Sequence, residues 1–273
     1  MLSNRSQDGW FASGFTLLEL IYHSAVRSVR MQHGNAMMGL LMNILQTLML
    51  VAVFYGMYLF AGWGGNGIRG DFLLYLMTGV FLYMCHVKAM GAVVGAEGPT
   101  SAMMKHAPMN TIVAIGAAAF GELYIQLLSV TVVLFLYHAA WTPLEFHDLL
   151  GCILMLLLAW FSGVAVGTIF LAMKPWNPKA VNLVSQVYSR TNMFASGKMF
   201  VANSLPGYML PYFMWNPLFH IIDQARGFAF LNYNPHYTSV LYPVAVTFAL
   251  LLLGLMGEFY TRKRASISWS AKH

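Results

Sequence analysis

Six long apolar runs constrain the fold of this chain more than any other feature. Each run reaches the about 20 residues that a helix needs to cross the roughly 30 Å hydrocarbon core of a membrane. The runs cover residues 40–61, 72–94, 111–137, 149–173, 180–202 and 239–258. Only 9% of the 273 residues are charged, compared with about 25% in soluble domains. So few charged side chains cannot cover the surface of a water-soluble protein of this size. The sequence therefore predicts an all-α membrane protein with six transmembrane helices.

Positive charges gather on one side of this topology. The loop after the third run holds Glu145 and Asp148 but no Lys or Arg, and the other loops on that side hold Arg69 and Arg226. Because Lys and Arg in short loops remain on the cytoplasmic side, we expect a multi-pass protein with both termini in the cytoplasm. The cations on the expected cytoplasmic side are Arg5, Arg27, Arg30, Lys105, Lys174, Lys179, Arg262, Lys263, Arg264 and Lys272.

An amphipathic helix is expected before the first span. Residues 14–31 place apolar side chains on one helical face, with His23, Arg27 and Arg30 opposite. Such a helix either lies in the cytoplasmic membrane interface, attracted to anionic lipid, or packs on a partner subunit, and the two are compatible. The predicted parts of the chain are a cytoplasmic segment, a six-span domain and a basic tail, at residues 1–35, 36–260 and 261–273.

A short segment between spans two and three is more apolar than a solvated loop needs to be. Pro99 and Pro108 bound it, and Met103, Met104 and His106 lie between them. Methionine-rich surfaces adapt to partners, so we expect one or two helical turns that dock on another protein. An ordinary tight loop remains the alternative.

A broken apolar stretch lies between the fifth and sixth runs. Ser204 and Pro206 resemble a helix start. Asn216 and Pro217 resemble a second start, and Gly227 suits the end of that second helix. Two helices of about ten residues, each about 15 Å long, are too short to span a membrane, so we expect two short re-entrant helices. Non-helical backbone at membrane depth needs protein or a water-filled cavity beside it, which predicts a pathway.

Ionisable side chains fall inside the predicted spans. Glu122 lies near the middle of span three and Arg190 near the middle of span five. A charge at the membrane centre costs at least about 2.5 kcal/mol, so each needs a partner or water. They either line a polar pathway or form a structural Glu–Arg pair. Lys88 and Lys198 lie closer to span ends, where they either snorkel to an interface or line the pathway.

The broken stretch also carries His220, Asp223 and Arg226, whose spacing of three puts them on a shared side of a helix. A catalytic interpretation needs a nucleophile or metal ligands nearby, and the sequence shows neither. We therefore expect a polar helix face directed at water or a neighbouring span. Tyr212 and Trp215 are typical of the aromatic belt at a membrane interface, or of rings that stack on sugars.

Motifs for energy conversion and catalysis are absent from the sequence. It contains no GxxxxGK(S/T) phosphate loop, no HExxH and no GxSxG, and its two cysteines lie in separate apolar runs. We expect no catalytic centre, metal site or cofactor in this chain, and no nucleic-acid partner. The sequence predicts a passive pathway that takes its energy from another subunit.

The stretch SGKMFVANSLPGYMLPYFMWNPLFHIIDQARGFAF (residues 196–230) resembles the membrane subunits of ABC-2 type exporters of capsular polysaccharide and O-antigen in Gram-negative bacteria. LMTG (76–79), AMMKHAPMN (102–110) and Glu122 resemble the capsule-export branch, and the resemblance covers nearly the whole chain. It implies an inner-membrane homodimer working with two ATP-binding cassette ATPase subunits, in which ATP and Mg²⁺ would bind. The exported molecule would be a lipid-linked polysaccharide.

The resemblance also implies roles for particular residues. Residues 97–109 would couple to the ATPase, through Glu97, Pro99, Met103, Met104, Lys105, His106 and Pro108. Residues 204–230 would form an outer gate, through Pro206, Pro211, Asn216, Pro217, His220, Asp223 and Arg226. The expected residues of the substrate pathway are Lys88, Glu122, Arg190, Lys198, Tyr212 and Trp215.

Other functions remain open from the sequence. An exporter of drugs or lipids from the same superfamily predicts a narrow apolar pathway, whereas a glycan exporter predicts a polar one. An intramembrane enzyme that uses His220 and Asp223, or a scaffold protein, is a further alternative. Periplasmic and outer-membrane export proteins are additional candidate partners.

Overall fold

Every regular element of the described chain is a helix. The computed structural model describes residues 19–25, 36–61, 71–96 and 111–270, and these residues form no strand. The prediction of an all-α protein is confirmed. The helices are α2 (Ala36–Ala61), α3 (Phe72–Gly95), α5 (Thr111–Ala140), α6 (Leu149–Met173), α7 (Pro178–Ala195), α8 (Leu210–Met214), α9 (Pro217–Ala229) and α10 (Leu241–Ser270), with a 3₁₀ turn, η1 (Ala202–Ser204), and a helix over residues 19–25.

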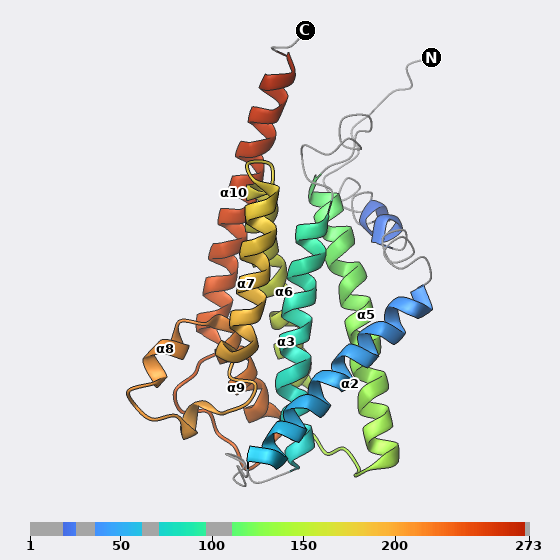
Figure 1. Cartoon of the computed structure of the whole chain (residues 1–273), viewed down its shortest axis with the longest axis vertical. Helices are drawn as coiled ribbons and strands as arrows, with labels where there is room; N and C mark the ends of the chain where they lie inside the picture. The colour runs from blue at the N-terminus through green and yellow to red at the C-terminus, as the bar shows by residue number, and fades with distance from the viewer. Residues whose placement is uncertain (1–18, 26–35, 62–70, 97–110, 271–273) are drawn as a thin grey trace.

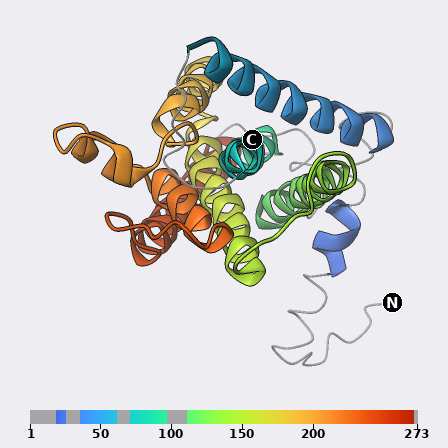
Figure 2. The ribbon, with the colours of Figure 1, turned by 90° about the horizontal axis from the view of Figure 1, so that it is seen from below.

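The long helices form a bundle around α3. Figure 1 shows α3 in the middle, α2 crossing it at a slant, and α9 at one end of the bundle, the α9 end. Most of α3 is buried, from Leu74 to Val94. Seen from the α9 end in Figure 2, α2 lies along one edge of the bundle and α8 extends away from it on another side. The buried core therefore centres on α3, while α2 and α8 lie at its edge.

Five of the described helices are long and apolar enough to cross a membrane. They are α2, α3, α5, α6 and the part of α10 up to Thr261. The prediction of six spans is therefore confirmed only in part. The helix that corresponds to the fifth predicted span, α7, is not among these five. It ends at Ala195, before the predicted end at residue 202, and its 18 residues include Asn182, Gln186 and Arg190. These polar side chains make α7 unlike a span that faces lipid.

The predicted pair of half-length helices has one member of the expected length. α9 begins at Pro217, as expected, because the Asn216 side chain accepts a hydrogen bond from the Leu218 backbone N–H (3.0 Å). The start predicted at Ser204 is instead the η1 turn, and α8 has only five residues. Gly207, a poor helix former, lies between η1 and α8. The re-entrant placement of this region stays a prediction.

Glycines let α6 approach α3 closely. An added Cβ at Gly163 would lie 2.2 Å from the His86 carbonyl oxygen, and one at Gly167 would lie 2.8 Å from the Cβ of Val93. The two glycines are four residues apart on one face of α6, in the small-residue pattern that brings membrane helices together. Neither position accepts a side chain unless α3 moves.

Replacing Gly163 by Ala is expected to lower the free energy of unfolding by about 1–3 kcal/mol, because the new methyl group pushes α6 away from α3. Gly91 on α3 is a matched control, since an added Cβ there has no atom within 4 Å. Gly91→Ala is expected to stabilise the helix by up to about 1 kcal/mol through propensity alone. Unfolding of both variants in detergent checks the pair, and equal stabilities would contradict the tight α3–α6 contact.

Candidate functional site

Arg226 is fully buried on α9. Its side chain is 0% exposed, and its guanidinium donates hydrogen bonds to the carbonyls of Gly197 (2.9 Å), Lys198 (2.5 Å) and Phe200 (2.6 Å). It also lies 4.1 Å from the centroid of the Tyr75 ring on α3. A guanidinium has several donors in fixed positions, which suits a row of backbone oxygens. Arg226 thus fastens the segment 197–200 to α9.

Asp223 lies one turn before Arg226 and is also buried. Its carboxylate accepts hydrogen bonds from the Ala202 backbone N–H (3.1 Å), the Tyr233 hydroxyl (2.6 Å) and the Thr238 hydroxyl (2.8 Å). Burial and the charge of Asp223 raise the pKa of Tyr233, so the phenol remains a donor. This carboxylate joins η1 to the segment that follows α9.

His220 is the third polar residue of the series and is held in a neutral form. Its Nδ1 accepts a hydrogen bond from the Ser239 backbone N–H (3.2 Å). The ring proton therefore lies on Nε2, which donates a hydrogen bond to the Met214 carbonyl (2.9 Å). Burial lowers the pKa of His220, which favours this form. No group of three metal-binding side chains occurs among the described residues. The polar face expected to meet water or a neighbouring span is buried mainly against the chain's own loops.

The other predicted gate residues lie around α8. The Asn216 amide donates to the Asn192 side-chain oxygen (2.8 Å) and to the Ala195 carbonyl (3.0 Å), which ties the start of α9 to the end of α7. Tyr212 and Trp215 are 83% and 81% exposed, on or beside the helix that extends from the bundle. The prolines of this region are Pro206 and Pro211, which are exposed, and Pro217, which is half-buried.

Lys198 is buried close to α2 and α3. Its side chain is 1% exposed, and its ammonium lies 3.8 Å from the ring centroid of Tyr83 and 4.4 Å from that of Phe54. Within the described residues its Nζ has no hydrogen-bond partner. This burial does not fit a side chain that snorkels to an interface.

Lys88, Glu122 and Arg190 lie apart from the polar residues of α9. Lys88 donates a hydrogen bond to the Gln46 side-chain oxygen (2.6 Å), and Glu122 accepts one from the Gln126 amide (2.8 Å). Arg190 is exposed on α7. In the part of the chain that the structure describes, no ion pair joins Glu122 to Arg190. The alternative of a structural Glu–Arg pair is therefore not supported.

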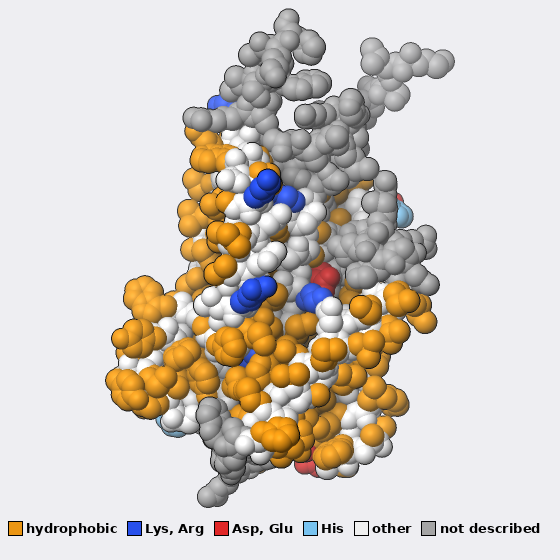
Figure 3. Space-filling model, in the orientation of Figure 1, with side chains coloured by type: hydrophobic (Ala, Val, Ile, Leu, Met, Phe, Trp, Pro, Cys, Tyr) orange, Lys and Arg blue, Asp and Glu red, His pale blue; other side chains and the backbone are white. Residues whose placement is uncertain are grey.

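One face of α7 contacts the bundle through polar groups, and the other is exposed. The Tyr188 hydroxyl forms a hydrogen bond with His86 Nε2 (2.9 Å), and the Tyr83 hydroxyl donates to the Ser189 carbonyl (3.0 Å). Figure 3 shows Lys and Arg side chains in the middle of the face on which α7 and α3 lie, while hydrophobic side chains dominate the lower part of that face. The exposed polar side chains of α7 are Lys179, Asn182, Gln186, Arg190 and Thr191.

Sequence reasoning missed a buried polar contact between α2 and α5. Asn43 donates to the Ser129 hydroxyl (2.9 Å), and Gln126 donates to the Asn43 side-chain oxygen (3.3 Å). All three side chains are at most 4% exposed. They carry no charge, so a search for ionisable groups inside spans does not find them. The available signal was the spacing of Gln126 and Ser129, which places both on one face of a helix.

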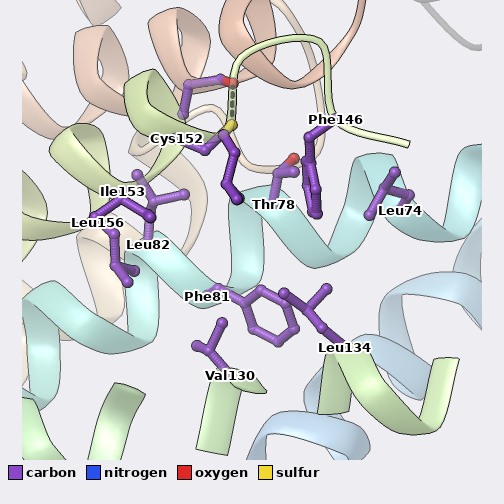
Figure 4. A pocket seen from close by; sticks show the side chains of 12 residues that line it. Leu74, Thr78, Phe81, Leu82, Val130, Leu134, Phe146, Cys152, Ile153 and Leu156 are labelled. Atoms are coloured by element: carbon purple, nitrogen blue, oxygen red, sulfur yellow. Dashed lines mark hydrogen bonds between the residues drawn. The ribbon is translucent and has the colours of Figure 1, made fainter. Parts of the chain in front are cut away.

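An apolar cavity of about 100 Å³ lies between α3, α5 and α6, near the α9 end. Figure 4 shows Phe81 and Leu134 on one side of it and Cys152 on the other. The hydroxyl of Thr78, also in the lining, donates to the Tyr75 carbonyl of its own helix (2.8 Å). A cavity with so few free polar groups offers little to a sugar, so it does not suit a glycan pathway.

The predicted coupling segment, residues 97–109, lies outside the described residues. Its coupling role therefore stays a prediction. The same holds for most of the expected interface helix, of which residues 19–25 are described and helical.

Comparison with known proteins gives a match over nearly the whole chain. That match is to individual proteins, since no protein-family model matches this chain. Two proteins from Escherichia coli, both named polysialic acid transport protein KpsM, are each 24% identical to the chain over 263 residues. The matched region covers 94% of this chain and 98% of each relative, so the likeness extends far beyond residues 196–230. The chain is similar along its length to proteins named for the transport of polysialic acid, and the resemblance to polysaccharide exporters predicted from its sequence is confirmed.

Proposed function

We propose that this chain is the transmembrane permease subunit of an ATP-driven exporter that moves a lipid-linked, acidic surface polysaccharide across the bacterial inner membrane. Its relatives are named as transport proteins for polysialic acid, a polymer of acidic sugars, and they match nearly the whole chain. In this role the chain is a transport subunit and not an enzyme. His220 and Asp223, the residues of the enzymatic alternative, are engaged with backbone and hydroxyl groups of the chain itself.

A row of exposed polar side chains on α7, which lies beside exposed apolar ones such as Leu183 and Val187, is the observation that carries this proposal. α7 packs in a bundle whose other long helices are apolar enough to span a membrane, yet it exposes Asn182, Gln186 and Arg190. An arginine that faces hydrocarbon costs at least about 2.5 kcal/mol, so this face needs water or another protein surface. Two copies that meet along α7 would enclose a polar passage, with Arg190 and Lys88 supplying positive charge to an acidic glycan.

The partners follow from the same proposal. The chain has no phosphate loop, so two ATPase subunits would bind ATP and Mg²⁺ and drive transport. Residues 97–109 would dock on these subunits at the cytoplasmic side, where both termini lie. Residues 204–230 would form the gate at the outer side, and Tyr212 and Trp215 would offer rings to sugars.

A strain that lacks this chain is expected to lose its surface polysaccharide and to accumulate the polymer inside the cell, because the polymer has no other route out. Antibody labelling of intact and permeabilised cells separates the two locations. Expression of the chain should restore surface labelling. A deletion strain with normal surface polysaccharide but altered drug or lipid export would contradict the proposal and support the other branch of exporters.

A further inference from the structure

The apolar cavity between α3, α5 and α6 has no part in the proposed passage of a glycan. Twelve of the described residues line it, and only Thr78 and Cys152 among them bear a polar side-chain group. Both groups are engaged, since the Thr78 hydroxyl donates to the Tyr75 carbonyl and the Cys152 thiol donates to the Ala225 carbonyl (3.9 Å; Figure 4). The volume of about 100 Å³ would admit water, which needs only about 10–15 Å³, but water also needs polar partners. The cavity therefore suits hydrocarbon.

The cavity opens to the surface beside α6. Its lining comes from α3 and, on the two sides of α3, from α5 and α6, all three of which are long and apolar enough to cross a membrane (Figure 4). Two lining residues of α6, Leu149 and Ile153, are 57% and 43% exposed. In a membrane, exposed apolar side chains of a spanning helix face lipid tails. An acyl chain from the bilayer can therefore reach the cavity.

The cavity lies at one end of the spanning helices, next to the loop 141–148. Its lining residues on α6 run from Leu149, the first residue of that helix, to Leu156, a rise of about 10 Å. Phe146 of the loop also belongs to the lining. The loop is held in place at this end, since the Asp148 backbone N–H donates to the Phe228 carbonyl (2.8 Å). A lipid whose chain enters the cavity would thus have its headgroup at the loop.

The loop 141–148 would present negative charge to that headgroup. It contains Glu145 and Asp148 and no Lys or Arg. The Asp148 carboxylate caps α6, whereas Glu145, directly before Phe146, is exposed and forms no ion pair with a described residue. Basic segments attract anionic lipids, and by the same electrostatics carboxylates attract an ammonium and repel an anion. The loop therefore favours a headgroup that carries an ammonium.

We propose that this cavity is a lipid-binding site, which takes one acyl chain of a phospholipid with an amino headgroup, such as phosphatidylethanolamine. The part of the chain nearest the headgroup fills the cavity, and the ammonium lies beside Glu145. This site goes beyond the proposed function, because its ligand is a lipid of the surrounding bilayer and not the exported molecule. An anionic lipid, such as an acidic anchor of the glycan, is disfavoured there by the charge of the loop.

Native mass spectrometry of the full chain identifies the lipid. The chain is released from nanodiscs that contain equal amounts of phosphatidylethanolamine and phosphatidylglycerol with the same acyl chains. One phosphatidylethanolamine is expected to remain bound, several-fold more often than phosphatidylglycerol. Equal retention of the two lipids, or a preference for phosphatidylglycerol, would overturn the assignment of the headgroup. A chain released without any bound lipid would overturn the site itself.

Two variants of the lining test whether the lipid lies in the cavity. Val130→Phe fills the space from α5 and should abolish retention, while Leu150→Phe, at a 67% exposed position of α6 outside the lining, should retain lipid like the parent. Ile153→Gln places an amide at the exposed rim and needs no room inside the cavity, so it should lower retention even where Val130→Phe does not fold. Undiminished retention by folded Val130→Phe or by Ile153→Gln would place the lipid elsewhere and overturn the proposal.

A charge reversal tests the headgroup. Glu145→Lys should shift the preference from phosphatidylethanolamine to phosphatidylglycerol, and Glu19→Lys, at an exposed carboxylate of the helix over residues 19–25, should leave it unchanged. The same preference in Glu145→Lys as in the parent would refute recognition by the loop. Export is measured separately in the complemented deletion strain. A chain that exports no glycan but retains phosphatidylethanolamine would contradict the proposed function and support the lipid site.

Discussion

Replacing Arg226 by Met is expected to lower the free energy of unfolding by at least about 3 kcal/mol. The change leaves three carbonyls, those of Gly197, Lys198 and Phe200, without the donor that they now share, and each unpaired buried group costs about 1–3 kcal/mol. The Tyr75 ring also loses the cation that it contacts. Denaturant unfolding in detergent, followed by circular dichroism, measures the loss.

Two variants control this prediction. Arg226→Lys keeps the charge but not the planar set of donors, so its stability should lie between those of the parent and Arg226→Met. Arg190→Met removes the same side chain from an exposed position and should change stability by less than about 0.5 kcal/mol. If Arg226→Met proved as stable as Arg190→Met, the fastening role of Arg226 would be refuted.

The ends of several helices were predictable because their signals are local. The second and fourth spans were predicted to begin at residues 72 and 149, where α3 and α6 begin. In both cases an aspartate precedes the helix: the Asp71 side chain accepts from the Leu73 N–H (2.8 Å), and Asp148 accepts from the Gly151 N–H (3.0 Å). A charged cap followed by an apolar run is visible in sequence, so these boundaries were confirmed.

The surroundings of the polar residues were not predictable, because their partners are distant in sequence and mostly belong to the backbone. Arg226 binds carbonyls nearly thirty positions earlier, and every residue type carries such a carbonyl. Lys198 lies between rings from α2 and α3, and only the packing of those helices brings the rings together. Spacing did place His220, Asp223 and Arg226 together, but it could not show that loops cover them.

The fifth predicted span, residues 180–202, differs from the observed helix α7 because the sequence does not show where the helix ends. Residues 180–202 contain enough apolar side chains to resemble a span, but the helix stops at Ala195, where Ser196 and Gly197 follow. Gly197 has a φ of 72°, which Gly adopts readily and which ends the helical path. The apolar residues counted beyond that point belong to the segment held by Arg226, so the helix itself is more polar than the run.

Replacing Arg190 by Glu is expected to reduce export of the acidic polysaccharide at least about tenfold, the effect of roughly 1.4 kcal/mol on a transport barrier. The reason is electrostatic: a carboxylate on the exposed face of α7 would repel an anionic chain that the guanidinium attracts. Arg190 forms no ion pair with the acidic groups of the described chain, so the reversal should leave folding and membrane insertion intact. Surface labelling of cells, normalised to the amount of the variant in membranes, measures export.

Matched variants on the same helix decide whether charge is the cause. Arg190→Lys should retain most of the export, since it keeps the cation, and Thr191→Ala, at the neighbouring exposed position, should export normally. Arg190→Gln should fall between Lys and Glu, because it neither attracts nor repels the polymer. Export that decreases in the order Arg190→Lys, Arg190→Gln, Arg190→Glu is expected only if the polymer passes close to this face. Equal export by all three variants would place the pathway elsewhere and remove α7 from its lining.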